Sequence, residues 1–112
     1  MINPFLINKT NDKSLYSPSQ KSILMLSDSC QNKCKPYIAY IPARTIGNLT
    51  SKKALRYKIE LETISEKMKI PFLDGENIID RNNEYNYAPK GGHLSMEGYA
   101  KFANFIIESI SE

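Results

Sequence analysis

Residues 36–43 read PYIAYIPA, a short apolar run that is bounded by prolines and rich in residues that favour β-structure. A run of this length with breakers at both ends predicts a buried strand. Residues 70–74, IPFLD, form a second run of the same kind, which ends at Asp74-Gly75. Short and continuously apolar strands are typical of parallel sheets that are covered on both faces.

Two amphipathic helices are predicted around these strands. Residues 51–68 carry one apolar stripe at helical spacing, made of Tyr57, Leu61, Ile64 and Met68. The last helix begins after Ser95, a favourable N-cap, and has Glu97 in its first turn, where the helix dipole favours an acid. Its predicted buried face consists of Tyr99, Phe102, Ala103, Ile106 and Ile110. Strands that alternate with helices predict an α/β fold with a short parallel sheet flanked by helices. So few strands suggest either a fragment or an obligate oligomer.

The composition is ordinary for a globular protein and names no partner. At 112 residues, with 41% hydrophobic and 24% charged residues and a net charge of +3, the chain forms one small domain at most. Basic residues at 52–58 are followed by glutamates at 60–66, which indicates a solvated helix face and no nucleic-acid partner. No apolar run approaches the ~20 residues of a membrane span. No signal peptide is readable either, so a cytoplasmic location is the default expectation.

The N-terminal part of the chain divides near residue 20. Residues 1–19 are predicted to be an extension or loop, in which Ser17 or Ser19 caps the element that follows. Residues 20–112 form the α/β segment. Within it, Cys30 and Cys34 would share one face of a helix, and two ligands alone make a poor zinc site. Partly buried free thiols are therefore predicted, with no metal.

His93, the only histidine, is the candidate functional residue. It follows Gly91 and Gly92 at the end of the irregular residues 77–92 and lies two residues before Ser95. Loops at the carboxyl ends of parallel strands are where α/β folds place their sites. A histidine near the positive end of a helix dipole is disfavoured as imidazolium, which keeps a neutral base available near pH 7. A plain structural role in the loop is the alternative.

The segment GGHLSMEGYAKFANFI, residues 91–106, resembles the terminal block of SGNH/GDSL-type hydrolases. PYIAYIPARTI resembles the penultimate strand of that family, and the helix at 51–68 with IPFLDGENII resembles the approach to its histidine loop. The resemblance covers about residues 20–110 and is closest to the group that includes alginate-type O-acetyltransferases. It implies a partial flavodoxin-like three-layer α/β/α sandwich. His93 would be the general base that takes a proton from a nucleophilic serine, and no cofactor or metal is implied.

The chain departs from the family pattern at two places. The family has an aspartate two or three residues before the histidine, where this chain has Gly91 and Lys90. Losing that orienting carboxylate can cost about 10⁴-fold in turnover, unless Asp74 or Asp80 replaces it. The family's oxyanion donors, in a Gly-x-Asn pattern, are also missing. Gly75-Glu76-Asn77 matches this pattern, but it follows the wrong strand for that role. A dyad and an inactive site both stay open.

Residues 23–30, ILMLSDSC, differ by one letter from a strand followed by the family's Gly-Asp-Ser nucleophile motif. If Ser29 were that nucleophile, only residues 30–35 would connect it to the next strand, whereas a crossover takes at least about 10–12 residues. The alternative is a helix with Ile23, Leu26, Cys30 and Cys34 on one apolar stripe. A helix is therefore predicted, with Ser29 as an ordinary helix residue.

The sequence thus resembles the C-terminal portion of an SGNH-type protein without the part that carries the nucleophile. The expected function is that of a serine esterase or O-acyltransferase fragment, which acts on a small-molecule or carbohydrate ester such as an O-acetyl group. A complementing N-terminal segment or a homo-oligomer would complete it. The alternative is an inactive SGNH-like remnant that serves as a binding or assembly module. An unrelated small α/β protein is the third hypothesis.

Overall fold

The structure, a computed structural model, describes residues 15–44 and 47–111. Residues 1–14 of the predicted N-terminal extension lie outside this range. The order of elements along the chain is α2 (Pro18–Cys30), β1 (Ile38–Tyr40), α3 (Gly47–Met68), β2 (Phe72–Asp74), the 3₁₀ turns η1 (Gly75–Asn77) and η2 (Glu84–Asn86), and α4 (Met96–Ile110).

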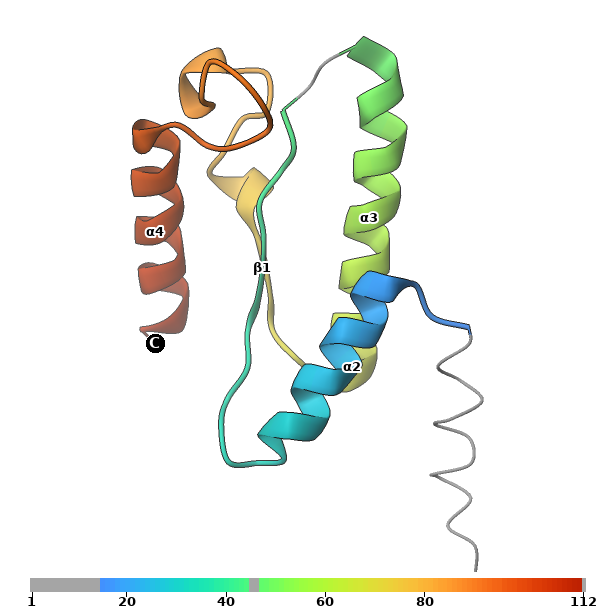
Figure 1. The fold of residues 1–112 in the computed structure, drawn as a ribbon. Helices are drawn as coiled ribbons and strands as arrows, with labels where there is room; N and C mark the ends of the chain where they lie inside the picture. Colours follow the sequence, from blue (N-terminus) through green and yellow to red (C-terminus); the bar gives the residue numbers. More distant parts are fainter. Residues whose placement is uncertain (1–14, 45–46, 112) are drawn as a thin grey trace, which may run out of the picture.

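The two strands form a parallel pair, which confirms the predicted α/β class. Ile38 lies opposite Phe72 and Tyr40 opposite Asp74, and α3 is the crossover between the strands. A parallel pair needs such a long connection because the chain must return to the starting edge of the sheet. Figure 1 shows α4 to the left of the strands and α2 and α3 to the right, with both strands running towards the loops at the top. The carboxyl ends of β1 and β2 therefore meet at this upper edge.

The conflict over ILMLSDSC is resolved in favour of the helix. Ser17 caps α2 by accepting a hydrogen bond from the Gln20 backbone, and the Gln20 side chain accepts from the Ser17 backbone in return. Pro18 occupies the first turn, where its missing N–H costs nothing. Ser29 lies in the last turn of α2 and is exposed. The helix begins at Pro18, two residues before Gln20, where the predicted α/β segment starts.

The prediction of free thiols is wrong, because Cys30 and Cys34 form a disulfide. The helix does not continue to Cys34, since Gln31 ends it in a left-handed conformation with φ 40°. The following turn brings the two Cα atoms to 5.2 Å, which is within the usual disulfide range. The predicted stripe on α2 is also partly wrong. Leu24 and Cys30 are the buried residues, whereas Leu26 is 39% exposed.

The core lies on both sides of the strand pair. From α3 it takes Leu61 and Ile64 as predicted, while Tyr57 is about half exposed. On the side of α4, Phe102 packs with Ile79, Tyr87 and Leu94. Phe102 is thus a core residue as predicted, but Tyr99 is 48% exposed, so its assignment to the core is wrong. None of the helices in residues 15–44 and 47–111 is long and apolar enough to cross a membrane.

Candidate functional site

His93 lies at the end of a short closed loop, which precedes α4 at the carboxyl edge of the strands (Figure 1). Tyr87 and Leu94 form an antiparallel bridge at the base of this loop. The Ala88 N–H donates to the His93 carbonyl at 2.9 Å and closes residues 88–93 into one turn. The His93 side chain is exposed. The backbone of His93 is therefore fixed, while its imidazole faces solvent.

The base of the loop is held by a buried asparagine. Asn86 is 1% exposed, and its side-chain amide donates to the Asp80 carbonyl at 3.1 Å. Its side-chain oxygen accepts a hydrogen bond from Lys101 Nζ at 2.9 Å, and its carbonyl accepts one from the Ser95 N–H at 2.8 Å. Ser95 also caps α4 by accepting from the Gly98 N–H at 3.0 Å. These bonds join the loop to the first turn of the last helix.

The loop is also tied to the end of β1. The Tyr87 hydroxyl donates to the Pro42 carbonyl at 2.7 Å, in a hydrogen bond that is buried. Arg44 Nη1 donates to the Ala88 carbonyl at 3.2 Å. Burial raises the pKa of Tyr87, and the positive charge of Arg81 partly opposes this effect. The neutral phenol is therefore the form that the fold favours.

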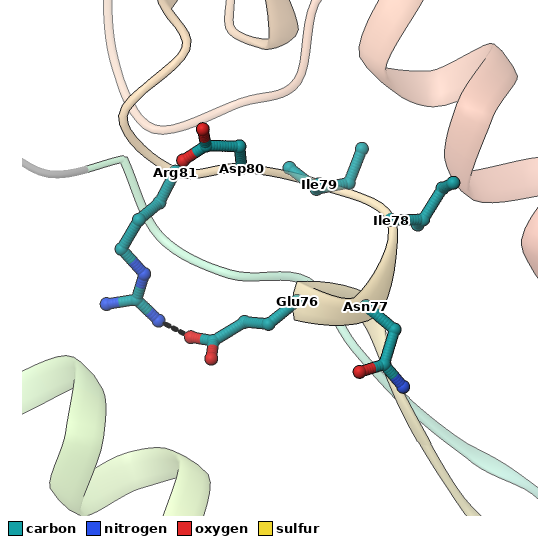
Figure 2. A pocket seen from close by; sticks show the side chains of 6 residues that line it. All are labelled: Glu76, Asn77, Ile78, Ile79, Asp80 and Arg81. Carbon is teal, nitrogen blue, oxygen red and sulfur yellow. Dashed lines mark ion pairs between the residues drawn. The ribbon is translucent and has the colours of Figure 1, made fainter.

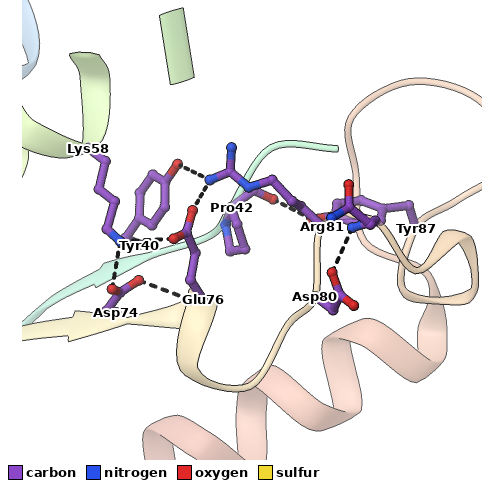
Figure 3. Close-up of polar contacts among 9 residues, drawn as sticks. Tyr40, Pro42, Lys58, Asp74, Glu76, Asp80, Arg81 and Tyr87 are labelled. Carbon is purple, nitrogen blue, oxygen red and sulfur yellow. Dashed lines mark hydrogen bonds and ion pairs between the residues drawn. The ribbon is translucent and has the colours of Figure 1, made fainter. Parts of the chain in front are cut away.

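A second group of polar side chains lies at the same edge and was missed in the sequence (Figure 3). We call this group, made of Tyr40, Lys58, Asp74, Glu76 and Arg81, the charged cluster. Lys58 Nζ is 2.7 Å from Asp74 and 2.9 Å from Glu76, and Arg81 pairs with the other oxygen of Glu76. The Arg81 guanidinium lies 3.4 Å from the Tyr40 hydroxyl. The two cations and the two carboxylates pair with one another, so the charged cluster carries no net charge.

The burial of Lys58 corrects one further expectation. Its side chain is only 15% exposed, so Lys58 does not belong to the solvated basic face that was predicted for residues 52–58. The signal in the sequence was its spacing from Tyr57, Leu61 and Ile64, which places it beside the buried stripe. Its ammonium also lies 5.8 Å from the centre of the Tyr40 ring, on the first strand.

A surface hollow of about 320 Å³ is lined by residues 76–81 (Figure 2). Two of the lining residues, Glu76 and Arg81, form an ion pair (Figure 2). Glu76 and Asn77 belong to η1, so the Gly75-Glu76-Asn77 segment is a 3₁₀ turn whose acid is engaged in ion pairs. His93 is not among the residues that line this hollow.

The two aspartates that could orient His93 are engaged elsewhere. Asp74 pairs with Lys58 and accepts a hydrogen bond from the Glu76 N–H at 3.0 Å. Asp80 accepts one from the Asn82 N–H at 2.9 Å. Within residues 15–44 and 47–111, the His93 side chain has no hydrogen-bond or ion-pair partner. Ser29 is distant as well, because the carboxyl end of α2 lies at the opposite end of the strands from the 88–93 loop (Figure 1).

In the part of the chain that the structure describes, no three histidine, cysteine, aspartate or glutamate side chains group as metal ligands would. Comparison of the chain with protein-family models, curated proteins and solved structures finds no significant match. Functional reasoning therefore depends on the geometry around His93 and on the residues of its loop.

Proposed function

We propose that this chain is the C-terminal portion of an SGNH-like esterase or O-acyltransferase unit, with His93 as its general base. The observation that carries the proposal is the position of His93. It lies on a fixed turn at the carboxyl edge of a parallel strand pair, two residues before the N-cap of α4. A general base needs an accessible imidazole on a backbone that does not move, because proton transfer depends on a short, well-aligned approach.

Among the described residues, only one edge of β1 is paired with a strand, and its other, free edge supports the proposal of a larger sheet. The Ile38 N–H donates to the Pro71 carbonyl, so in a parallel ladder the backbone groups of Tyr37, Ala39 and Ile41 point away from β2. Pro36 and Pro42 lie in the other register, so neither proline removes a donor from this edge. Ala39 is exposed, although the run around it is apolar on both faces. In a complete three-layer α/β/α sandwich, a further parallel strand would pair with the free edge of β1, and the added layer would cover Ala39.

The substrate class follows from the proposed chemistry. A serine hydroxyl on a complementing segment would attack an ester carbonyl, such as that of an O-acetyl group on a small molecule or carbohydrate. His93 would accept the hydroxyl proton and return it to the leaving alcohol. Alternatively, a second copy of this chain would supply the nucleophilic serine.

One observation favours the alternative of an inactive binding or assembly module. Among the described residues, no carboxylate forms a hydrogen bond or ion pair with the His93 side chain, and the two positions where one is expected hold Lys90 and Gly91. A positive side chain near the imidazole opposes the imidazolium that forms during proton transfer. A remnant with this half-fold would still present the free edge of β1 to a partner strand.

Fluorophosphonate labelling separates the two. Purified protein, with any co-purifying chain retained, is treated with a fluorophosphonate and assayed with a short-chain aryl ester. The enzyme proposal expects a labelled serine and ester hydrolysis, both lost in His93→Ala and both kept in Lys90→Ala, an exposed neighbour on the same loop. Absence of any labelled serine from the protein and its partners would refute the enzyme and leave the module.

A further inference from the structure

The disulfide between Cys30 and Cys34 has two unequal ends. Cys30, the last residue of α2, is 5% exposed, whereas Cys34 lies in an exposed turn. A thiolate must approach one sulfur along the line of the bond, so attack is directed to the sulfur that solvent reaches. In this bond that sulfur belongs to Cys34.

The turn that carries Cys34 is positively charged. Lys33 and Lys35 flank the cysteine, and residues 31–37 contain no acidic residue. Both lysines are exposed. Their charges attract an anionic thiol such as glutathione, and they stabilise the negative charge that develops on sulfur during exchange.

The turn between the two cysteines is the segment that the bond holds closed. Gln31 and Asn32 both have positive φ, 40° and 67°, a conformation that residues other than glycine seldom adopt. The Lys33 N–H donates to the Cys30 carbonyl at 2.7 Å within this turn. The disulfide is therefore one of the constraints that hold these two residues in the turn that leads into β1.

We propose that Cys34 is a thiol–disulfide exchange site for glutathione-like thiols and disulfides, and that Cys30 is its resolving partner. In the oxidising direction, the Cys34 thiolate attacks a glutathione disulfide, forms a mixed disulfide and releases one glutathione thiolate. Cys30 then attacks the Cys34 sulfur, loses its proton to solvent and releases the second glutathione. The protein dithiol is oxidised by two electrons, and one glutathione disulfide is reduced to two thiols.

Trapping of the mixed disulfide tests this assignment. Wild-type protein, Cys30→Ser and Cys34→Ser are reduced under native conditions, freed of reductant and mixed with oxidised glutathione, and adducts are located by intact mass and peptide mapping. Wild type is expected to end as the internal disulfide without an adduct. Cys30→Ser should accumulate a stable adduct on Cys34. In Cys34→Ser, the remaining thiol of Cys30 should react at least about tenfold more slowly, because a buried thiol reacts only through local opening.

Two outcomes overturn the proposal. One is an adduct on Cys30 that forms in Cys34→Ser as fast as the Cys34 adduct forms in Cys30→Ser. The other is alkylation of both cysteines in unreduced, denatured wild-type protein prepared under oxidising conditions, which would show that no disulfide exists. Circular dichroism of each variant shows whether it is folded. Failure here leaves the proposed role of His93 untouched, because the two sites share no residue.

Discussion

Gly98 in the first turn of α4 offers a test in which the local and tertiary effects of one methyl group have opposite signs. In an isolated helix, Gly98→Ala is expected to stabilise by about 1 kcal/mol, because alanine loses less backbone entropy. In this fold, a Cβ atom at Gly98 would lie 2.1 Å from the Asn86 carbonyl oxygen and 3.2 Å from the Leu94 side chain. The methyl group thus meets the backbone that supports the His93 loop.

The size of the effect follows from what must move. Carbon contacts become favourable only near roughly 3.5 Å, so α4 and the Asn86 backbone must separate by more than about 1 Å. That shift breaks or stretches the bond from the Ser95 N–H to the Asn86 carbonyl and the bond from Lys101 to the Asn86 side chain. Each contributes about 1 kcal/mol, and overpacking typically costs ~1–3 kcal/mol more. After the gain in helix propensity, Gly98→Ala should lower the free energy of unfolding by about 2–4 kcal/mol.

Urea denaturation followed by circular dichroism measures the change, with free energies from linear extrapolation. Gly92→Ala is the matched control, because a Cβ there meets no atom within 4 Å. It should change stability by less than about 0.5 kcal/mol. If Gly98→Ala is as stable as the wild type or more so, α4 does not pack on the loop base as described, and the account of how His93 is held fails.

Three further substitutions or treatments probe other contacts, each by urea denaturation. Tyr87→Phe should destabilise by about 1–2 kcal/mol and Tyr85→Phe, at an exposed position, should not. Burial raises the pKa of Tyr87 in the folded state. The buried neutral phenol therefore contributes fully to the free energy of unfolding below the ordinary tyrosine pKa of about 10, and this contribution is lost as pH rises through the higher pKa of the folded state. Tyr87→Phe should therefore show a smaller alkaline loss than the wild type. Lys58→Met should cost about 1–2 kcal/mol, because it leaves two carboxylates without their ammonium partner, while Lys52→Met on the exposed face should be neutral. Reducing the disulfide, which closes a short loop, should cost about 2 kcal/mol, and a protein equally stable with and without reductant would contradict this.

The elements were predictable because their signals are local. Ser95 was expected as a cap and Ser17 was one of two candidates, with Ser19, and both Ser95 and Ser17 accept the hydrogen bond that a cap requires. The two short apolar runs pair in parallel, since a helix long enough to cross over lies between them. The connection from Ser29 to the next strand is too short for a crossover, which is a geometric limit that residue spacing alone reveals. These inferences needed no knowledge of which residues touch.

Side-chain burial was less predictable. Periodicity shows which face of a helix is apolar, but it does not show how much of that face the neighbouring elements cover. Tyr99 and Phe102 are neighbours on α4, yet only Phe102 meets Ile79, Tyr87 and Leu94. Tyr99 does not belong to this buried cluster and is 48% exposed. The same limit applies to Tyr57 on α3, whose ring centre lies 6.3 Å from that of Tyr40 while nearly half of the residue stays in solvent.

The disulfide and the charged cluster depend on turns that the sequence does not specify. The four-residue spacing of the cysteines fits a helix as well as it fits a turn, and the left-handed Gln31 decides between them. Lys58, Glu76 and Arg81 come from a helix, a 3₁₀ turn and an irregular segment. Their meeting requires both the crossover and the reversal after β2. No pattern of residue types within one element would reveal it.

The two polar groups at the carboxyl edge of the strands differ in a way that bears on chemistry. In the charged cluster every charge is compensated, so a proton taken up or released there would break an ion pair and carry an energetic cost. That arrangement suits a rigid support for the strand ends. His93 has the opposite character, because its backbone is fixed while its imidazole has no partner among the described residues. If His93 is a general base, the carboxylate that orients it must come from the segment that brings the serine, or the pair must work as a dyad. The partner strand expected on the free edge of β1 would then supply more than a nucleophile.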